Sequence, residues 1–315
     1  MVQITGSEES LSFLQTADHR HPHPWYNTHM DEDYPVLPQF LKFKSSQGPC
    51  SVGCEWNADT QCLEITDLSG GFPGQMIQPD RLRWKAFWLL LDLAGVWHWQ
   101  RTYAPDDVLS CDGHQWSIEI SRDGRYVNTC GSEAYPGTAE RDYREGSPFD
   151  ILSTAIKVLL SRDSLHGLGL DEERSTEPVP FDFHEWSDAF EDMGTQLTWD
   201  RQSQALRWKP VSNRYPEWHP LPPPSPQTWK AFRLLLDHAN IHSWEARYTS
   251  VTTAHVGWGF EAQVGDRNIS TAGGDTYPNS EEGHTGYLSG SPYDILLTGL
   301  GLLAGKEIQD LRTRA

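Results

Sequence analysis

The amino-acid sequence predicts an α+β fold, in which an antiparallel-sheet domain with two helices occurs twice in tandem. The first observation is a repeat, since RWKAFWLLLD in the first half returns as TWKAFRLLLD in the second. The second is the spacing, because Trp84 and Trp229 lie 145 residues apart and Trp116 and Trp258 lie 142 apart. A unit of this length is too long for a solenoid repeat, so two similar domains are expected. The third is that strand and helix signals follow the same order in each copy.

These repeats divide the 315 residues into five parts. The aromatic content of 11% is higher than disordered chains contain, so most of the sequence is expected to fold. Asp171, Glu172 and Glu173 mark the segment between the copies as an acidic linker. The predicted parts are a polar His-rich arm (1–38), the first copy (39–161), the linker (162–180), the second copy (181–306) and a C-terminal tail (307–315).

Each copy is expected to begin with a pair of strands that leads into the first helix. The segments CEWNADTQCLEI and LTWDRQSQALRW place Trp56 and Trp199 at matching positions. After the helix, a further strand is expected near Tyr103 in the first copy and near Tyr248 in the second. An antiparallel sheet with helices is the architecture that this order favours.

The first helix of each copy has clear start signals. Asp80 precedes it in the first copy and Ser225 in the second, and both residue types are good N-caps. Pro226 then occupies the favoured first helical position. Apolar residues follow at helical spacing, which predicts one buried face. They are Trp84, Phe87, Trp88 and Leu91 in the first copy, and Trp229, Phe232, Leu235 and Leu236 in the second.

A hairpin follows in each copy. Asp123-Gly124 and Gly265-Asp266 are two-residue turn signals between alternating segments. If these residues form the turns, a tryptophan faces a strand glycine in both copies, an arrangement that protects the glycine. The same register sorts the residues between the two faces of the sheet. The expected pairs are Trp116 with Gly131 and Trp258 with Gly273. The residues expected to share one face are Trp116, Ile118, Ile120, Val127 and Thr129 in the first copy, and Trp258, Phe260, Ala262, Ile269 and Thr271 in the second.

The second helix of each copy begins at a related motif, SPFDIL or SPYDIL. Ser147 and Ser291 are expected to be N-caps, each followed by proline at the first helical position. Asp150 and Asp294 then stand three residues after the cap, which is a variant of the capping box.

Charge and composition bound the classes of partner. The net charge of −19 repels nucleic acid and phospholipid at long range and attracts a basic partner, although many soluble proteins are acidic for solubility alone. No apolar run approaches the roughly 18 residues of a membrane span, and the N-terminus lacks a secretory signal. Five cysteines, an odd number, fit reduced thiols better than a disulfide scaffold. A cytoplasmic protein that binds neither nucleic acid nor membrane is expected, and the oligomeric state is left open.

Polar residues that recur in both copies are the candidate binding site. Glu119 and Glu261 are predicted on the outer sheet face, opposite to the core residues. The alternatives are an acidic recognition surface, a catalytic carboxylate pair, or ordinary solvated positions. The candidate binding residues are Glu119, Glu133 and Tyr135 in the first copy and Glu261, Asp275 and Tyr277 in the second.

Three further groups could carry other chemistry. Asp112 and His114 stand close enough for acid–base work, although an ordinary strand entry is the simpler interpretation. Cys50, Cys54 and Cys62 have a poor spacing for zinc. Imidazole and carboxylate groups on the N-terminal arm suit zinc, nickel or copper, but a solvated arm fits the prolines there better. The arm's candidate ligands are His19, His21, His23, His29, Asp31, Glu32 and Asp33.

No catalytic residue, metal site or cofactor is assigned, because the chain has no P-loop, dinucleotide glycine motif, G-x-S-x-G or H-E-x-x-H.

The pattern W-x-W, D-G-x-x-W-x-I-x-I and G-S-x-A-Y-P resembles one that recurs in small uncharacterised bacterial proteins. The resemblance covers about a third of the first copy and implies a bacterial accessory protein, such as an immunity or defence-associated factor. It implies no active site. The second copy departs from the pattern, since the Asp-Gly is missing and Gly274 and Thr276 replace Ser132 and Ala134. The residues that carry it are Trp97, Trp99, Asp112, Gly113, Trp116, Ile118, Ile120, Gly131, Ser132, Ala134, Tyr135 and Pro136.

The function expected from the sequence is therefore a non-enzymatic acidic binding protein, immunity- or inhibitor-like, that engages a basic protein partner. The alternative is a metal-binding protein or metal-dependent enzyme that uses the His-rich arm.

Overall fold

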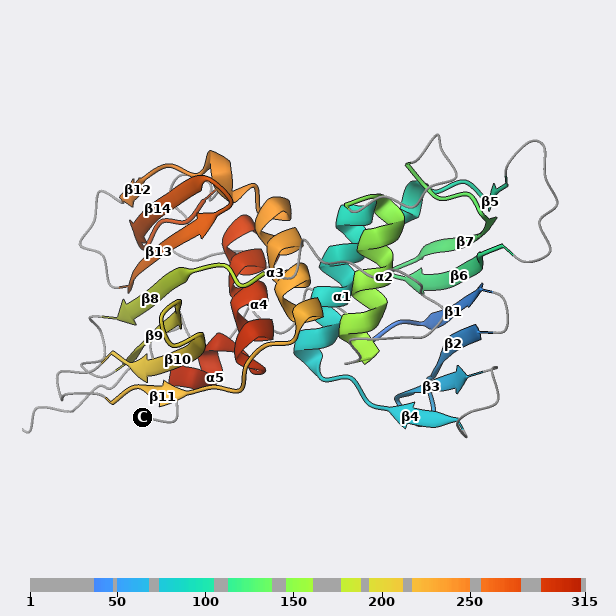
Figure 1. Cartoon of the computed structure of the whole chain (residues 1–315), viewed down its shortest axis with the longest axis horizontal. Coiled ribbons are helices and arrows are strands. Elements are labelled where there is room, and N and C mark those ends of the chain that lie inside the picture. The colour runs from blue at the N-terminus through green and yellow to red at the C-terminus, as the bar shows by residue number, and fades with distance from the viewer. Residues whose placement is uncertain are drawn as a thin grey trace, which may run out of the picture. The chain divides into compact units, whose positions relative to one another are not determined.

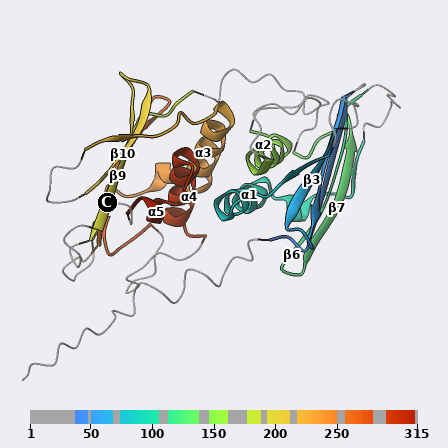
Figure 2. The ribbon, with the colours of Figure 1, turned by 90° about the horizontal axis from the view of Figure 1, so that it is seen from below.

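The computed structural model describes residues 37–47, 50–67, 74–104, 113–137, 146–160, 177–187, 193–211, 217–249, 256–278 and 290–312. Within them the chain forms the same arrangement twice, a seven-stranded sheet with helices packed against one face (Figures 1 and 2). The predicted α+β fold class and its tandem duplication are confirmed. The candidate metal ligands of the N-terminal arm, and linker residues 162–176, lie outside the described residues.

The sheet of copy one has the strand order β4-β3-β2-β1-β6-β7-β5. Neighbouring strands are antiparallel except β5, which runs parallel to β7 at the sheet edge. The strands are β1 (Phe40–Gln47), β2 (Cys50–Asn57), β3 (Cys62–Asp67), β4 (Gln75–Ile77), β5 (Thr102–Tyr103), β6 (Gln115–Arg122) and β7 (Arg125–Ser132). The helices are α1 (Arg81–Ala94), the short 3-10 helix η2 (Val96–His98) and α2 (Pro148–Leu160).

Copy two repeats this order as β11-β10-β9-β8-β13-β14-β12, again with one parallel pair at the edge. A short helix α5 lies within the predicted tail, and its Ile308 and Leu311 are buried. The strands are β8 (Phe181–Ser187), β9 (Met193–Asp200), β10 (Ala205–Pro210), β11 (His219–Pro220), β12 (Arg247–Thr249), β13 (Val256–Val264) and β14 (Arg267–Gly274). The helices are α3 (Pro226–His238), η3 (Ile241–Ser243), α4 (Pro292–Ala304) and α5 (Ile308–Arg312).

Each copy has four strands before its first helix, where the sequence predicted a pair. The predicted pair corresponds to β2 and β3 in copy one, and to β9 and β10 in copy two. The additional β1 and β8 are central, since each joins the predicted pair to the hairpin. They were missed because FLKFKSSQ and FDFHEWS share little beyond alternating inward residues. The other additional strands, β4 and β11, are only short edge pieces.

The predicted helix starts are confirmed. A carboxylate oxygen of Asp80 accepts a hydrogen bond from the backbone N–H of Arg83 at 2.8 Å, and Ser225 Oγ accepts one from Thr228 N–H at 3.2 Å. Ser291 likewise caps α4. These bonds satisfy N–H groups that a helix start otherwise leaves without an acceptor.

Both hairpins have the predicted register. Trp116 lies opposite Gly131 and Trp258 lies opposite Gly273. A Cβ added at either glycine would overlap the indole ring, so the ring can occupy this position only because the facing residue is glycine. The ring nitrogens donate to backbone carbonyls just beyond the hairpins, at 3.0 Å in both copies. The side chains predicted to face the core are buried or half-buried there. Across the described part of the chain, no helix is long and apolar enough to cross a membrane.

Candidate functional site

The two recurring glutamates lie on the outer sheet faces, away from the helices, as the register predicted. Glu119 accepts a hydrogen bond from the hydroxyl of Tyr126 at 2.7 Å. Glu261 accepts a longer one, of 3.4 Å, from Ser270. Glu119 lies on β6, which pairs with the central strand β1, and Glu261 lies on β13, which pairs with the central strand β8. Both are therefore available to solvent or to a partner on the open face of the sheet.

The other candidate residues lie elsewhere. The rings of Tyr135 and Tyr277 are buried below the hairpins, with Tyr277 4.7 Å from the ring of Tyr293. Glu133 and Asp275 follow the hairpins with positive φ angles of 47° and 49°. Asp275 is buried and uses a carboxylate oxygen to accept the backbone N–H of the residue that starts β13, at 2.9 Å. The six predicted binding residues therefore form two separate groups in each copy.

A buried polar cluster in copy one joins Ser45 and His114 to Tyr135. The hydroxyl of Ser45 is 2.7 Å from His114 Nε2, and the hydroxyl of Tyr135 is 2.8 Å from His114 Nδ1. Burial lowers the pKa of His114 to about 4, because the charged ring would lose its hydration. Burial, assisted by the nearby charge of Glu133, raises the pKa of Tyr135 to about 12. Asp112, the acid considered beside His114, lies outside the described residues.

This cluster resembles a nucleophile with its base, but its environment does not suit catalysis. Ser45 is only 1% exposed, so a substrate has little access to its hydroxyl. An imidazole with a pKa near 4 is a weak base at neutral pH. Copy two places Glu185 and Val256 at the positions of Ser45 and His114, since Ser45 and Glu185 lie opposite the equivalent tryptophans. The cluster is best understood as a satisfied polar part of the copy-one core.

The outer face of copy two holds a second group, here called the copy-two outer strip. It consists of Asp182, His184 and Trp186 on β8 with Glu261, Gly259 and Gly257 on β13. Strand register places these residues opposite one another in three pairs, Asp182 with Glu261, His184 with Gly259 and Trp186 with Gly257.

The two glycines allow the aromatic rings of the strip to lie across β13. A Cβ added at Gly257 would overlap the ring of Trp186, and one added at Gly259 would overlap the ring of His184. The two rings stack on each other with centroids 5.3 Å apart and an interplanar angle of 19°. Trp186 remains 37% exposed, so this large aromatic surface is open to solvent on the sheet face.

Two carboxylates lie next to the rings, and the described part of the chain places no lysine or arginine beside them. Like charges directly opposite each other on neighbouring strands are destabilising, yet Asp182 faces Glu261. Asp182 is held by both of its oxygens, which accept from Gln196 Nε2 at 3.0 and 2.9 Å. His184 Nδ1 lies 3.8 Å from Asp182, and within the described ranges neither carboxylate has a lysine or arginine within ion-pair distance.

Copy one has the opposite chemistry at the same place. Lys42 occupies the position of Asp182, faces Glu119 and forms an ion pair of 2.7 Å with Glu55. Lys44 and Ser46 replace the aromatic residues, and they face Ser117 and Gln115 where copy two has glycines. The two copies therefore differ on both of the facing strands. Where copy one has a paired cation, copy two has an anion with no lysine or arginine partner among the described residues, together with an aromatic surface.

Sequence reasoning found Glu261 in this strip but missed the three residues of β8. The available signal was GWGF at the start of β13, where glycines alternate with buried aromatics on a strand that copy one begins with QWSI. Glycine inside a strand often marks a close approach by another group.

The described residues show no metal centre. No group of three or more histidine, cysteine, aspartate or glutamate side chains among them could hold a metal ion. Cys54 is a free, buried thiol, and burial raises its pKa to about 12, which disfavours the thiolate that zinc requires. The side chain of Cys50 is outside the described part.

Acidic charge is unevenly distributed along the chain. The described residues contain 23 of the 44 aspartates and glutamates but 18 of the 25 lysines and arginines, a net charge of −5. The remaining negative charge belongs to residues outside the described ranges. Comparison with protein-family models, curated proteins and solved structures found no match to this chain.

Proposed function

We propose that this chain is a non-enzymatic binding protein, immunity- or inhibitor-like, that engages a basic protein partner through the copy-two outer strip. The observation that carries the proposal is the pair Asp182 and Glu261, two adjacent carboxylates with no lysine or arginine beside them in the described structure. A lysine or arginine from a partner would relieve their repulsion. It could also lie over the exposed ring of Trp186, where a cation is attracted to the aromatic face.

The difference between the copies supports recognition over simple solubility. Solubility requires charge but no aromatic surface, and exposed tryptophan works against it. Tryptophan is enriched where interfaces derive most of their binding energy, and charge complementarity speeds encounter. The free cysteines Cys54, Cys62 and Cys130 agree with a reducing compartment such as the cytoplasm. The resemblance of the sequence pattern to small bacterial proteins is the basis for proposing a bacterial accessory protein.

The proposal is tested with defined basic peptides in place of the unidentified partner. Arginine-rich and lysine-rich peptides are titrated into the full chain while tryptophan fluorescence and heat release are recorded. We expect binding that weakens as salt is raised, because the contact is partly between opposite charges.

The decisive variant is Asp182→Lys, which installs the lysine of copy one at the equivalent place. It is expected to preserve the fold, because the new lysine faces Glu261 as Lys42 faces Glu119, and to reduce peptide affinity at least tenfold. The matched control is Glu119→Gln in copy one, which should leave affinity unchanged. Equal binding by Asp182→Lys and the unchanged protein would refute the proposed site.

A further inference from the structure

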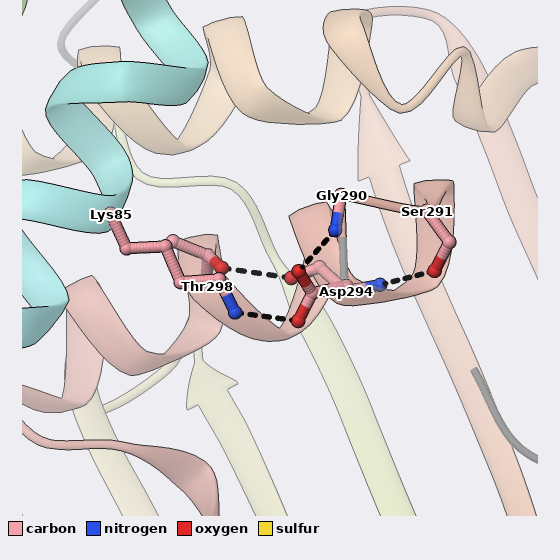
Figure 3. A network of polar contacts seen from close by, with 5 residues as sticks. All are labelled: Lys85, Gly290, Ser291, Asp294 and Thr298. Carbon is pink, nitrogen blue, oxygen red and sulfur yellow. Dashed lines mark hydrogen bonds and ion pairs between the residues drawn. The ribbon is translucent and has the colours of Figure 1, made fainter. Parts of the chain in front are cut away.

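Among the described residues, two ion pairs cross between the copies. Both are formed by the same two positions of the repeat. Lys85 of α1 binds Asp294 of α4, with 2.6 Å between Nζ and Oδ1 (Figure 3). Lys230 of α3 binds Asp150 of α2 at 2.5 Å. Lys85 and Lys230 are equivalent in the repeat, as are Asp150 and Asp294. When residue i contacts j and j contacts i, the interface is isologous, as in a two-fold dimer.

Each aspartate is held in the same way. The second carboxylate oxygen of Asp294 accepts the backbone N–H of Gly290, and Ser291 Oγ accepts the backbone N–H of Asp294 (Figure 3). The hydroxyl of Thr298 donates to the carbonyl of Asp294 at 2.8 Å. In copy one, Asp150 makes the same three bonds with Gly146, Ser147 and Thr154. The capping aspartate reaches one residue further back than in an ordinary capping box, and its other oxygen receives the lysine of the other copy.

The apolar part of the contact is matched as well. Among the described residues, four buried copy-two residues belong to the hydrophobic core cluster of copy one, so that core extends into copy two. The copy-one residue at each equivalent position is of the same type and is also buried. The four pairs are Ala231 with Ala86, Leu235 with Leu90, Ala239 with Ala94, and Ile295 with Ile151.

We infer that this helical face is a self-complementary dimerisation surface that fits a second copy of the same domain. The chain is then a two-fold dimer whose halves are joined by a linker. The contrast with the outer faces supports this, since Lys42 and Asp182 differ in charge while every charged position of the crossing ion pairs is retained.

One part of the face is not symmetric. A cavity of about 290 Å³ is lined by residues of both copies, including Leu82, Lys157 and Gln227. Leu82 packs close to Gly301, since a Cβ added at Gly301 would lie 3.2 Å from the leucine side chain. The equivalent pair on the other side is Gln227 with Lys157. Pairing of unlike copies therefore fits better here than pairing of like copies.

The test uses charge reversal within one copy of the full chain. The double variant combines Lys85→Asp with Asp150→Lys. Within one chain, position 85 then has the same charge as Asp294, and position 150 has the same charge as Lys230. Two such chains can still satisfy every contact if copy one pairs with copy one and copy two pairs with copy two. We expect the mass in solution, measured by light scattering at micromolar concentration, to double relative to the unchanged protein.

Two control variants carry similar changes but keep opposite charges within the chain. Lys85→Asp with Asp294→Lys reverses one crossing pair, and reversal of all four residues reverses both. Both controls are expected to fold, by circular dichroism, and to keep the mass of the unchanged protein. If the one-copy reversal stays at that mass or unfolds while the controls fold, the inference is overturned.

A second measurement leaves the face itself unchanged and decides the case if a control fails to fold. A protease site is placed within linker residues 162–176 of the full chain, and the folded protein is cleaved. Native mass spectrometry after incubation is expected to show pairs of unlike copies together with a smaller amount of like pairs. Separation into single copies, or complete absence of like pairs, would refute self-complementarity.

Discussion

At the scale of single residues, burial decides how the polar groups behave. His114 is held between two hydroxyls under the copy-one hairpin, and its surroundings favour the neutral ring. Lys230 and Asp150 are almost fully buried and form an ion pair by direct contact. The same principle therefore produces a neutral imidazole in one place and a buried ion pair in another.

His114 gives a prediction for the pH dependence of stability. Its pKa is about 4 in the folded protein against 6.5 when unperturbed, so the unfolded chain binds the additional proton first as pH falls. The stabilisation of the folded state by the neutral His114 ring is fully present above pH 6.5. It is lost as pH falls toward 4, which lowers the free energy of unfolding by up to about 3 kcal/mol. Urea unfolding of the unchanged protein and of His114→Gln across this range measures it. A constant stability difference between the two proteins from pH 7 to pH 4 would contradict the prediction.

The two crossing ion pairs give a matched comparison. The side chain of Lys230 is 2% exposed and that of Lys85 is 24% exposed, although their partners are equally buried. Replacing Lys230 by Ala removes the cation that contacts Asp150 and is expected to cost about 3–5 kcal/mol of unfolding free energy, because a buried ion pair loses one of its partners. Lys85→Ala is expected to cost less, because water can reach Asp294 through the space that is vacated. Chemical denaturation checks the order, and an equal or larger loss for Lys85→Ala would show that exposure does not set the cost.

At the scale of elements, the hairpins were predictable and the central strands were not. The turn residues and alternating pattern around Trp116 and Gly131 are local, so they specify the register without knowledge of the rest of the chain. The pairing of β8 with β13 joins segments far apart in the sequence, and no local pattern encodes it. For this reason the sequence predicts the outer-face position of Glu261 correctly but does not indicate that Asp182 lies beside it.

Alanine substitutions of Gly257 on β13 and of Gly273 on β14 are expected to differ in their effect on stability. In Gly273→Ala the new methyl group meets the buried ring of Trp258, which cannot move without disrupting the core, so a loss of about 1–3 kcal/mol is expected. In Gly257→Ala it meets Trp186, which can lift into solvent. The second change should cost little stability but weaken binding of basic peptides. Thermal unfolding and peptide titration of both variants separate the two effects, and a large stability loss in Gly257→Ala would contradict this account.

At the scale of the whole molecule, duplication was plain from the sequence because the best-preserved strings carry the contact between the copies. WKAF contains the lysine of each crossing pair, and SPFDIL or SPYDIL contains the aspartate. The sequence predicts the repeat but not the contact between the copies, because nothing in one copy indicates that its lysine contacts an aspartate of the other. The outer faces, by contrast, differ between the copies, as Lys42 and Asp182 show.

Because the copy-one core includes residues of α3 and α4, the described parts of both copies should unfold as one cooperative unit. Tryptophan fluorescence reports on both cores, whose buried indoles include Trp88 and Trp258, and circular dichroism reports on both sheets. In the unchanged protein the two probes are expected to give coincident denaturation curves. Removing both crossing lysines, in Lys85→Ala with Lys230→Ala, weakens the link and should separate the curves into two transitions. Two transitions in the unchanged protein would show instead that each copy is stable alone, and that the contact between them contributes little to folding.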